Sequence, residues 1–247
     1  MKKLSAALLA TLFAISSLCS ADQTPQSLQT EITHKVDVRF MLHLPKGYEE
    51  ATDKNWPMIL FLHGAGERGD DLQKVTVHGP PKLVKNGKEL GFIIVSPQCP
   101  KDTSWDNRDL IALLDHVQSS YRVDRDRTYL TGLSMGGYGT WSLGLRNPLR
   151  FAAIAPVCGG GVTIDTRLAR RDKTAPLNQL PIWAFHGGKD SVVPPEESAR
   201  LVDLLKKNNP QVKLTIYPEA SHDSWTATYD NPELYEWFLS HSLKDRK

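Results

Sequence analysis

The sequence Thr128-Tyr129-Leu130-Thr131-Gly132-Leu133-Ser134-Met135-Gly136-Gly137-Tyr138 places a serine between two glycines, where the chain changes its pattern. Residues 128–131 are typical of a buried strand, and residues 138–146 have the apolar spacing of a helix. A strand that turns directly into a helix leaves no space for side chains beside the turn. The pattern G-x-S-x-G therefore predicts a sharp turn that exposes Ser134 at the carboxyl end of a strand.

The helix predicted after Ser134 adds an electrostatic argument. The N-terminus of a helix carries partial positive charge, and its first N–H groups are free to bind an anion. The backbone N–H of Met135 is therefore predicted to face the negative charge that develops when a serine attacks a carbonyl. The alternative is a tight glycine turn around an unreactive serine, and the partners available to Ser134 distinguish the two.

A serine hydroxyl is a poor nucleophile and needs a base, which in turn needs an orienting acid. Three histidines follow Ser134 in the chain. His186 ends an apolar strand core, and His241 lies in the predicted terminal helix. His222 lies in a loop after the last predicted strand, where a base would reach the serine, so we predict that His222 is the base.

The acid is predicted at Asp190, in the sequence His186-Gly187-Gly188-Lys189-Asp190 after the strand core 182–185. This position is the carboxyl end of the strand before the one that leads to His222. Asp165, after the preceding strand, is the alternative acid, and Asp223 is too close in sequence to His222 to orient it easily. A turn aspartate that only accepts backbone N–H groups is the other interpretation of Asp190.

Apolar runs and helical patterns alternate along the chain, which predicts an α/β domain with a mainly parallel central sheet. Two short strand-like runs lie within 32–44. The segments 66–91 and 159–180 are the longest without a clear pattern, and 159–180 is too short for a large lid. The further apolar runs are 58–62, 92–95, 128–131, 152–155, 182–185 and 212–217, and the further helical patterns are 109–121, 138–146, 196–207 and 232–243.

The sequence Leu62-His63-Gly64-Ala65-Gly66-Glu67-Arg68-Gly69-Asp70-Asp71 also fits G-x-G-x-x-G, the spacing of a dinucleotide-binding turn. Such a turn opens a helix and is followed by an acidic residue that closes the next strand. Here Gly79-Pro80-Pro81 would break a helix starting at the loop, and the next strand ends in Val95-Ser96-Pro97. We therefore do not predict a nucleotide cradle.

Composition and charge indicate a globular protein without a polyanionic partner. The chain has 247 residues and a formal net charge of +2, which is too small for a nucleic-acid surface. Residues 1–21 have the basic start, apolar core and small final residues of a secretory signal. We expect a secreted or periplasmic protein, a single domain over 22–247 and no membrane association after signal cleavage.

Three cysteines bear on these expectations. Lipoprotein anchoring at Cys19 is not expected, because the bulky Leu18 stands where that signal normally has a small residue. Cys99 and Cys158 would remain after cleavage. In an oxidising compartment two cysteines can form a disulfide or stay as buried thiols, and the sequence leaves both open.

Together these residues resemble the α/β-hydrolase superfamily. The chain is similar in particular to bacterial esterases and predicted peptidases related to the catalytic domain of prolyl oligopeptidase. The resemblance runs from about residue 36 to residue 238. It is carried by residues 62–71, 132–141, 186–194 and 220–225.

The resemblance implies the α/β-hydrolase fold, with a mainly parallel sheet of about eight strands, helices on both faces and no large lid. It implies acyl transfer by Ser134, His222 and Asp190. It also implies that the loop after His63 supplies a second oxyanion donor, the backbone N–H of Ala65, beside that of Met135.

No cofactor and no metal are expected, because His63, His78 and His186 lack the spacing of zinc ligands. Trp105, Tyr138 and Trp225 are candidates for contact with the substrate, with simple packing as the alternative. Glu67 and Arg68 either shape the oxyanion loop or complete a solvated turn.

The sequence thus predicts a secreted serine carboxylesterase that acts on a small-molecule or polymer-borne ester through an acyl-enzyme. A serine peptidase acting on short peptides is the alternative. A feruloyl or acetyl esterase for polysaccharides, a polyester depolymerase and a non-catalytic binding protein of the same fold are further alternatives. The sequence does not indicate an oligomeric state.

Overall fold

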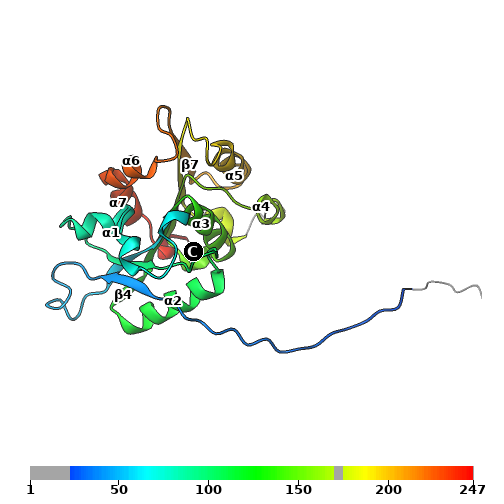
Figure 1. Cartoon of the computed structure of the whole chain (residues 1–247), viewed down its shortest axis with the longest axis horizontal. Helices are drawn as coiled ribbons and strands as arrows, with labels where there is room; N and C mark the ends of the chain where they lie inside the picture. Colours follow the sequence, from blue (N-terminus) through cyan, green and yellow to red (C-terminus); the bar gives the residue numbers. More distant parts are fainter. Residues whose placement is uncertain (1–22, 170–174, 247) are drawn as a thin grey trace, which may run out of the picture. The chain divides into compact units, whose positions relative to one another are not determined.

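The computed structural model describes residues 23–169 and 175–246 (Figure 1). The predicted signal, 1–21, lies outside the described residues. The described chain divides into two units, the segment that ends at Lys35 and the compact unit Val36–Lys247. The second unit contains every helix and strand that the structure describes.

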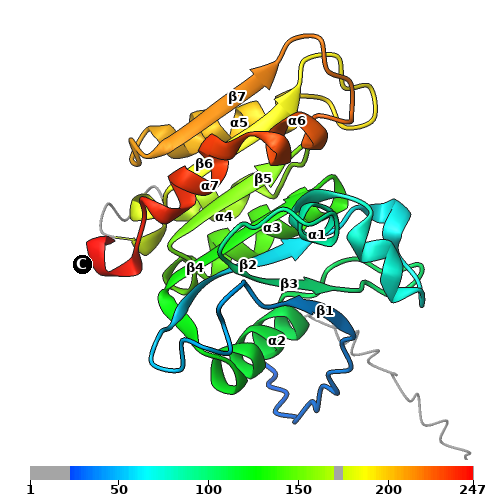
Figure 2. The same ribbon diagram turned by 90° about the vertical axis from the view of Figure 1, so that its left-hand side faces the viewer.

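Seven strands form one sheet in the order β1-β3-β2-β4-β5-β6-β7 (Figure 2). All neighbouring strands are parallel except β1 and β3. The interior strand β2 is buried along its whole length, as expected for a parallel strand covered on both faces. The strands are β1 (Phe40–His43), β2 (Trp56–Leu62), β3 (Ile93–Pro97), β4 (Val123–Leu133), β5 (Ala153–Val157), β6 (Ile182–Gly187) and β7 (Val212–Tyr217).

Helices cover both faces of this sheet, and β2 divides its side chains between them. Met58, Leu60 and Leu62 join the cluster formed with α2 (Asn107–Ser120), α3 (Met135–Arg146) and α5 (Glu196–Lys206). Ile59 and Phe61 join the opposite cluster, with α1 (Gly79–Lys85), α6 (Trp225–Asp230) and α7 (Pro232–Leu239). Among the helices of the described residues, none has the length and apolar composition needed to cross a membrane.

The predicted α/β architecture, a mainly parallel sheet with helices on both faces, is confirmed. The described part of the chain has seven strands rather than about eight, because only one of the two runs within 32–44 is a strand. Residues 32–39 are mostly exposed and have no strand structure. Alternating apolar residues do not make a strand unless a neighbouring strand accepts and donates the backbone hydrogen bonds.

As predicted, no helix runs from the glycine loop through the prolines at 80 and 81, but a new helix, α1, begins at this point. Proline is tolerated in the first turn of a helix, where its missing N–H would have no acceptor. The segment 66–91 thus contains α1 and two short 3₁₀ helices, η1 (Ala65–Glu67) and η2 (Leu72–Thr76). Short elements also occupy the described part of 159–180, namely α4 (Thr163–Ala169) and η4 (Pro176–Gln179). Two further 3₁₀ helices are η3 (Pro148–Arg150) and η5 (Leu243–Arg246).

Candidate active site

Ser134 lies at the turn between β4 and α3, in a backbone conformation that side-chain-bearing residues rarely adopt. Its φ is 53° and its ψ is −117°. Glycine is required at both flanking positions of the motif because backbone atoms lie where a Cβ would be. A Cβ added to Gly136 would lie 1.9 Å from the carbonyl oxygen of Leu62, and one added to Gly132 would lie 2.5 Å from that of Gly136. The turn therefore has the sharpness that the sequence predicts, and it holds Ser134 in a strained position.

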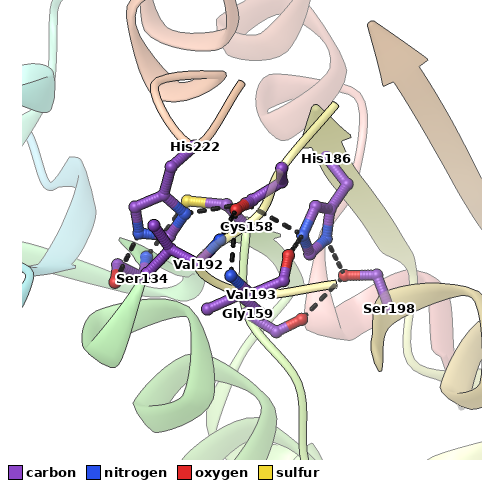
Figure 3. A network of polar contacts seen from close by, with 9 residues as sticks. Ser134, Cys158, Gly159, His186, Val192, Val193, Ser198 and His222 are labelled. Atoms are coloured by element: carbon purple, nitrogen blue, oxygen red, sulfur yellow. Dashed lines mark hydrogen bonds and ion pairs between the residues drawn. The ribbon is translucent and has the colours of Figure 1, made fainter. Parts of the chain in front are cut away.

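The structure brings the three sequence-predicted residues Ser134, His222 and Asp190 into one line of hydrogen bonds (Figure 3). His222 Nδ1 lies 2.7 Å from Asp190 Oδ2, and His222 Nε2 lies 3.0 Å from Ser134 Oγ. A carboxylate only accepts, so Nδ1 carries the proton and Nε2 accepts the serine hydroxyl. In this tautomer the imidazole can take the serine proton as a general base.

The three residues come from loops at the same edge of the sheet, after β4, β6 and β7. The loops that carry Asp190 and His222 are bonded to each other, because the N–H of Lys189 donates to the carbonyl of Ala220 at 2.9 Å. The backbones approach so closely that a Cβ on Gly187 would lie 2.0 Å from the carbonyl oxygen of Ser221. The distance between acid and base is therefore set by backbone contacts as well as by their own hydrogen bond.

Asp190 is the most enclosed of the three residues, since its side chain has no exposed surface while that of His222 is 19% exposed. Burial acts to raise the pKa of Asp190, but hydrogen bonds from His222 and from the N–H groups of Val193 and Val192 outweigh it, so the pKa lies below its usual value. Both backbone bonds reach Oδ1 at 2.9 Å. The acid is therefore held as a carboxylate with a fixed orientation.

The predicted oxyanion donors Met135 and Ala65 lie at the start of α3 and η1. The orientation of the Ala65 N–H is set by His63, whose Nδ1 lies 2.7 Å from the carbonyl oxygen of Gly64. The N–H of Cys99 donates to His63 Nε2 at 3.0 Å, so Nδ1 carries the ring proton and donates to Gly64. In a trans peptide C=O and N–H point in opposite directions, so the Ala65 N–H faces away from His63.

The loop around Ala65 is in contact with the nucleophile turn. A Cβ on Gly64 would lie 3.6 Å from Ser134 Cβ. Arg68 holds the loop from the outside, where its Nε donates to the carbonyl of Ala65 and its Nη1 to that of Thr103, each at 3.0 Å. The G-x-G-x-x-G glycines therefore belong to a loop that approaches Ser134, and Arg68 supports that loop.

The three aromatic residues proposed for substrate contact have different surroundings. The Trp225 ring packs edge-to-face on His222, with ring centroids 5.3 Å apart. Tyr138, in the first turn of α3, is exposed. The indole N–H of Trp105 donates to the carbonyl of His63 at 3.2 Å, so this residue supports the oxyanion loop. Trp225 and Tyr138 therefore have the better position to meet a substrate.

Comparison with known proteins agrees with the fold. The family model of phospholipases and carboxylesterases matches residues 97–231, more than half of the chain. The chain belongs to the phospholipase/carboxylesterase family. The resemblance to the α/β-hydrolase superfamily is thereby confirmed, and the predicted enzyme class, a carboxylesterase-type hydrolase, agrees with this family.

Individual members of the superfamily are similar over most of the chain. A thermostable esterase of known structure has 32% sequence identity and a TM-score of 0.69, over 84% of this chain and 60% of the esterase. A bifunctional acetylxylan esterase/xylanase of Neocallimastix patriciarum is 26% identical over 74% of this chain, which spans 26% of that protein. A poly(3-hydroxyoctanoate) depolymerase of Pseudomonas fluorescens is 26% identical over 75% of this chain and 74% of its own length.

Cys99 and Cys158 are free thiols, and the disulfide left open by the sequence is not formed. Cys158 lies against the nucleophile turn, where its Sγ accepts the backbone N–H of Ser134 at 3.3 Å. Burial raises the pKa of the Cys158 thiol to about 12. Cys158 therefore contributes a neutral sulfur to the surroundings of Ser134.

Reasoning from the sequence missed that His186 contacts Asp190. His186 Nε2 lies 3.3 Å from Asp190 Oδ2, and both side chains are fully buried. The signal available in the sequence was the spacing of four residues between His186 and Asp190, with a Gly-Gly turn between them.

Asp165, the alternative acid, belongs to α4, but its side chain lies outside what the structure describes. The described residues include no group of three metal-ligating side chains that could hold a metal ion.

Proposed function

We propose that this protein hydrolyses carboxylic esters, with Ser134 as nucleophile, His222 as general base and Asp190 as the acid that orients the base. One observation carries the proposal: the unbroken line of hydrogen bonds from Asp190 through His222 to Ser134, at 2.7 and 3.0 Å. Ser134 is also partly exposed at the end of this line, so an ester can reach it.

In the proposed reaction His222 Nε2 takes the hydroxyl proton as Ser134 Oγ attacks the ester carbonyl. The backbone N–H groups of Met135 and Ala65 stabilise the oxyanion, and a donor of this kind contributes about 3–4 kcal/mol to the transition state. The imidazolium then gives its proton to the leaving alcohol, which leaves an acyl-enzyme on Ser134. Water attacks the acyl-enzyme with His222 again as base, which releases the acid and restores the serine.

The substrate we propose is a small-molecule or polymer-borne ester. The similar proteins include an acetylxylan esterase and a poly(3-hydroxyoctanoate) depolymerase, whose names describe esters attached to or forming a polymer. A polymer requires an accessible nucleophile, and the partial exposure of Ser134 and His222 fits this requirement. We also propose secretion or transfer to the periplasm, because residues 1–21 have the pattern of a secretory signal.

The finer assignment from the sequence, to the esterase and peptidase group related to prolyl oligopeptidase, is part of this proposal. A peptidase would use the same three residues, and the difference lies in the leaving group. An amine leaves only when it is protonated, which makes it a more demanding leaving group than an alcohol. Rates measured on one preparation with esters and amides of the same acyl group therefore distinguish an esterase from a peptidase.

The test compares p-nitrophenyl esters of increasing acyl length, the matching p-nitroanilides, a feruloyl ester and acetylated xylan. We expect ester hydrolysis by the wild type, a loss of at least about 10³-fold in kcat for Ser134→Ala, and unchanged activity for Ser142→Ala, which removes a serine from the same helix α3. Full activity of folded Ser134→Ala would contradict the proposal. Faster cleavage of anilides than of esters would identify a peptidase.

A further inference from the structure

His186 is a fully buried histidine at the end of β6, and the proposed reaction does not use it. Oδ2 of Asp190 lies 3.3 Å from His186 Nε2 and 2.7 Å from His222 Nδ1. Figure 3 shows the His186 and His222 rings on opposite sides of this network. Burial of a polar ring requires a hydrogen-bond partner for each nitrogen. The partners of His186 show what the ring does for the acid.

The Nε2 atom of His186 faces two groups that can only accept a hydrogen bond. The carbonyl oxygen of Val193 lies at 2.9 Å and Oδ2 of the Asp190 carboxylate at 3.3 Å. Nε2 therefore carries a proton and donates it. The same carboxylate accepts the N–H of Val193 at Oδ1, so His186 contacts both ends of a closed turn from Asp190 to Val193.

The other ring nitrogen has a separate partner. Nδ1 lies 2.8 Å from Ser198 Oγ on α5, and the same Oγ lies 2.8 Å from the carbonyl oxygen of Gly159. With the ring proton on Nε2, the single proton of the Ser198 hydroxyl lies between these two acceptors. Gly159 follows Cys158, whose Sγ accepts the N–H of Ser134. The ring thus connects the acid loop to the segment after β5 that also supports the nucleophile.

We propose that His186 is a positioning residue for the acid: through its Nε2 proton it holds Oδ2 of Asp190 at the point where that oxygen also meets His222 Nδ1. The inference rests on the proposed function, since it assigns Asp190 the role of the acid. His222 Nδ1 lies closer to this oxygen than His186 Nε2, at 2.7 Å against 3.3 Å, so His186 restrains the carboxylate without replacing His222 as its principal partner.

The proposed contact between His186 Nε2 and Asp190 Oδ2 predicts that two substitutions of His186 differ in their effect on kcat. The terminal amide of glutamine reaches about as far as Nε2, whereas that of asparagine reaches only about as far as Nδ1. His186→Gln therefore keeps a donor to Asp190, and His186→Asn keeps only the contact with Ser198. Misplacement of a catalytic group by about 1 Å costs roughly 10²-fold in rate. We expect kcat to fall roughly 10- to 100-fold in His186→Asn with KM within about threefold, and to recover to within about fivefold in His186→Gln.

The experiment measures kcat and KM for the wild type and both variants with p-nitrophenyl acetate, together with their thermal unfolding. Ser198→Ala is the control, because it removes the partner of Nδ1 and leaves the Nε2 donor in place. We expect its kcat to stay close to that of the wild type at a comparable loss of stability. Equal kcat values for His186→Asn and His186→Gln would overturn the proposal, and so would a loss in Ser198→Ala as large as that in His186→Asn.

A second measurement does not depend on turnover. Two-dimensional ¹H–¹⁵N NMR of the wild type and of Ser134→Ala reports which nitrogen of each histidine carries a proton. We expect a protonated Nε2 on His186 in both proteins, and a proton on Nδ1 alone would overturn the proposal. Full activity of Ser134→Ala would refute the proposed function, while wild-type kcat in His186→Asn beside an inactive Ser134→Ala would refute this inference alone.

Discussion

The Asp190→Asn substitution tests the hydrogen-bond network at its most connected residue. It changes one oxygen to an NH₂ group at almost constant volume. The oxygen that remains is needed at the Oδ1 position, where it accepts the N–H groups of Val192 and Val193 at 2.9 Å. The new NH₂ group then points at His222 Nδ1, which donates to Asp190 in the wild type, and at His186 Nε2, which lies 3.3 Å from Oδ2.

The expected effect follows from these contacts. His222 can accept from the amide only if its proton moves to Nε2, and in that tautomer it cannot accept the proton of Ser134. In other serine hydrolase triads this exchange lowers kcat about 10⁴-fold, equivalent to about 5 kcal/mol in the activation free energy. Loss of hydrogen bonds to a buried charge also destabilises the fold, and we expect about 2–3 kcal/mol for this residue.

The assay follows hydrolysis of p-nitrophenyl acetate at pH 8 and unfolding in urea for the wild type and Asp190→Asn. Asp165→Asn is the matched control, because Asp165 is the alternative acid in the sequence. We expect the control to keep wild-type kcat. Suppose that Asp190→Asn kept more than about a tenth of the wild-type activity while Asp165→Asn lost its activity. The acid would then be misassigned, and the conclusion that Asp190 orients His222 would be wrong.

Three further predictions concern the turn, the acid and the thiol. Gly136→Ala should give little folded protein, because its Cβ would lie 1.9 Å from the carbonyl oxygen of Leu62. The control Gly66→Ala, with no atom within 4 Å of its Cβ, should express and melt like the wild type. Equal yields of the two variants would contradict the close packing around Gly136. Because folding lowers the pKa of Asp190, its ionisation stabilises the fold at pH values above the unfolded-state pKa. The urea midpoint should therefore fall as the pH drops below about 4. An unchanged midpoint down to about pH 3 would argue against a buried carboxylate. Cys158, with a pKa of about 12, should not react with a thiol reagent at pH 8 until the protein unfolds, and rapid labelling of the native protein would show that the thiol is accessible.

The sequence predicts most of the site because its chemistry restricts which residues can occupy it. A sharp strand-to-helix turn requires glycine beside Ser134, and parallel strands bring their carboxyl ends to one edge of the sheet. The order of Ser134, Asp190 and His222 along the chain then indicates which loops meet. Continuous apolar runs predict the buried strands, since only a strand covered on both faces can be apolar throughout.

Other features depend on tertiary contacts that local patterns do not express. The run at 32–39 alternates like a strand but forms none, and α1 begins at two prolines inside the segment 66–91, which has no clear pattern. His186 has the sequence context of a strand end, and its contact with Asp190 arises only because the Gly-Gly turn folds back on β6. The state of Cys99 and Cys158 likewise depends on where β3 and β5 lie in the sheet.

Active-site labelling tests the central claim most directly. A fluorophosphonate reacts with a serine only where a base activates the hydroxyl and donors stabilise the developing charge. The wild type should incorporate one label per chain, on the tryptic peptide that contains Ser134, with loss of ester hydrolysis in proportion to labelling; His222→Ala should not be labelled at a comparable rate. An active wild-type enzyme that resists the reagent, or that carries the label on another residue, would contradict the assignment of Ser134 as the nucleophile.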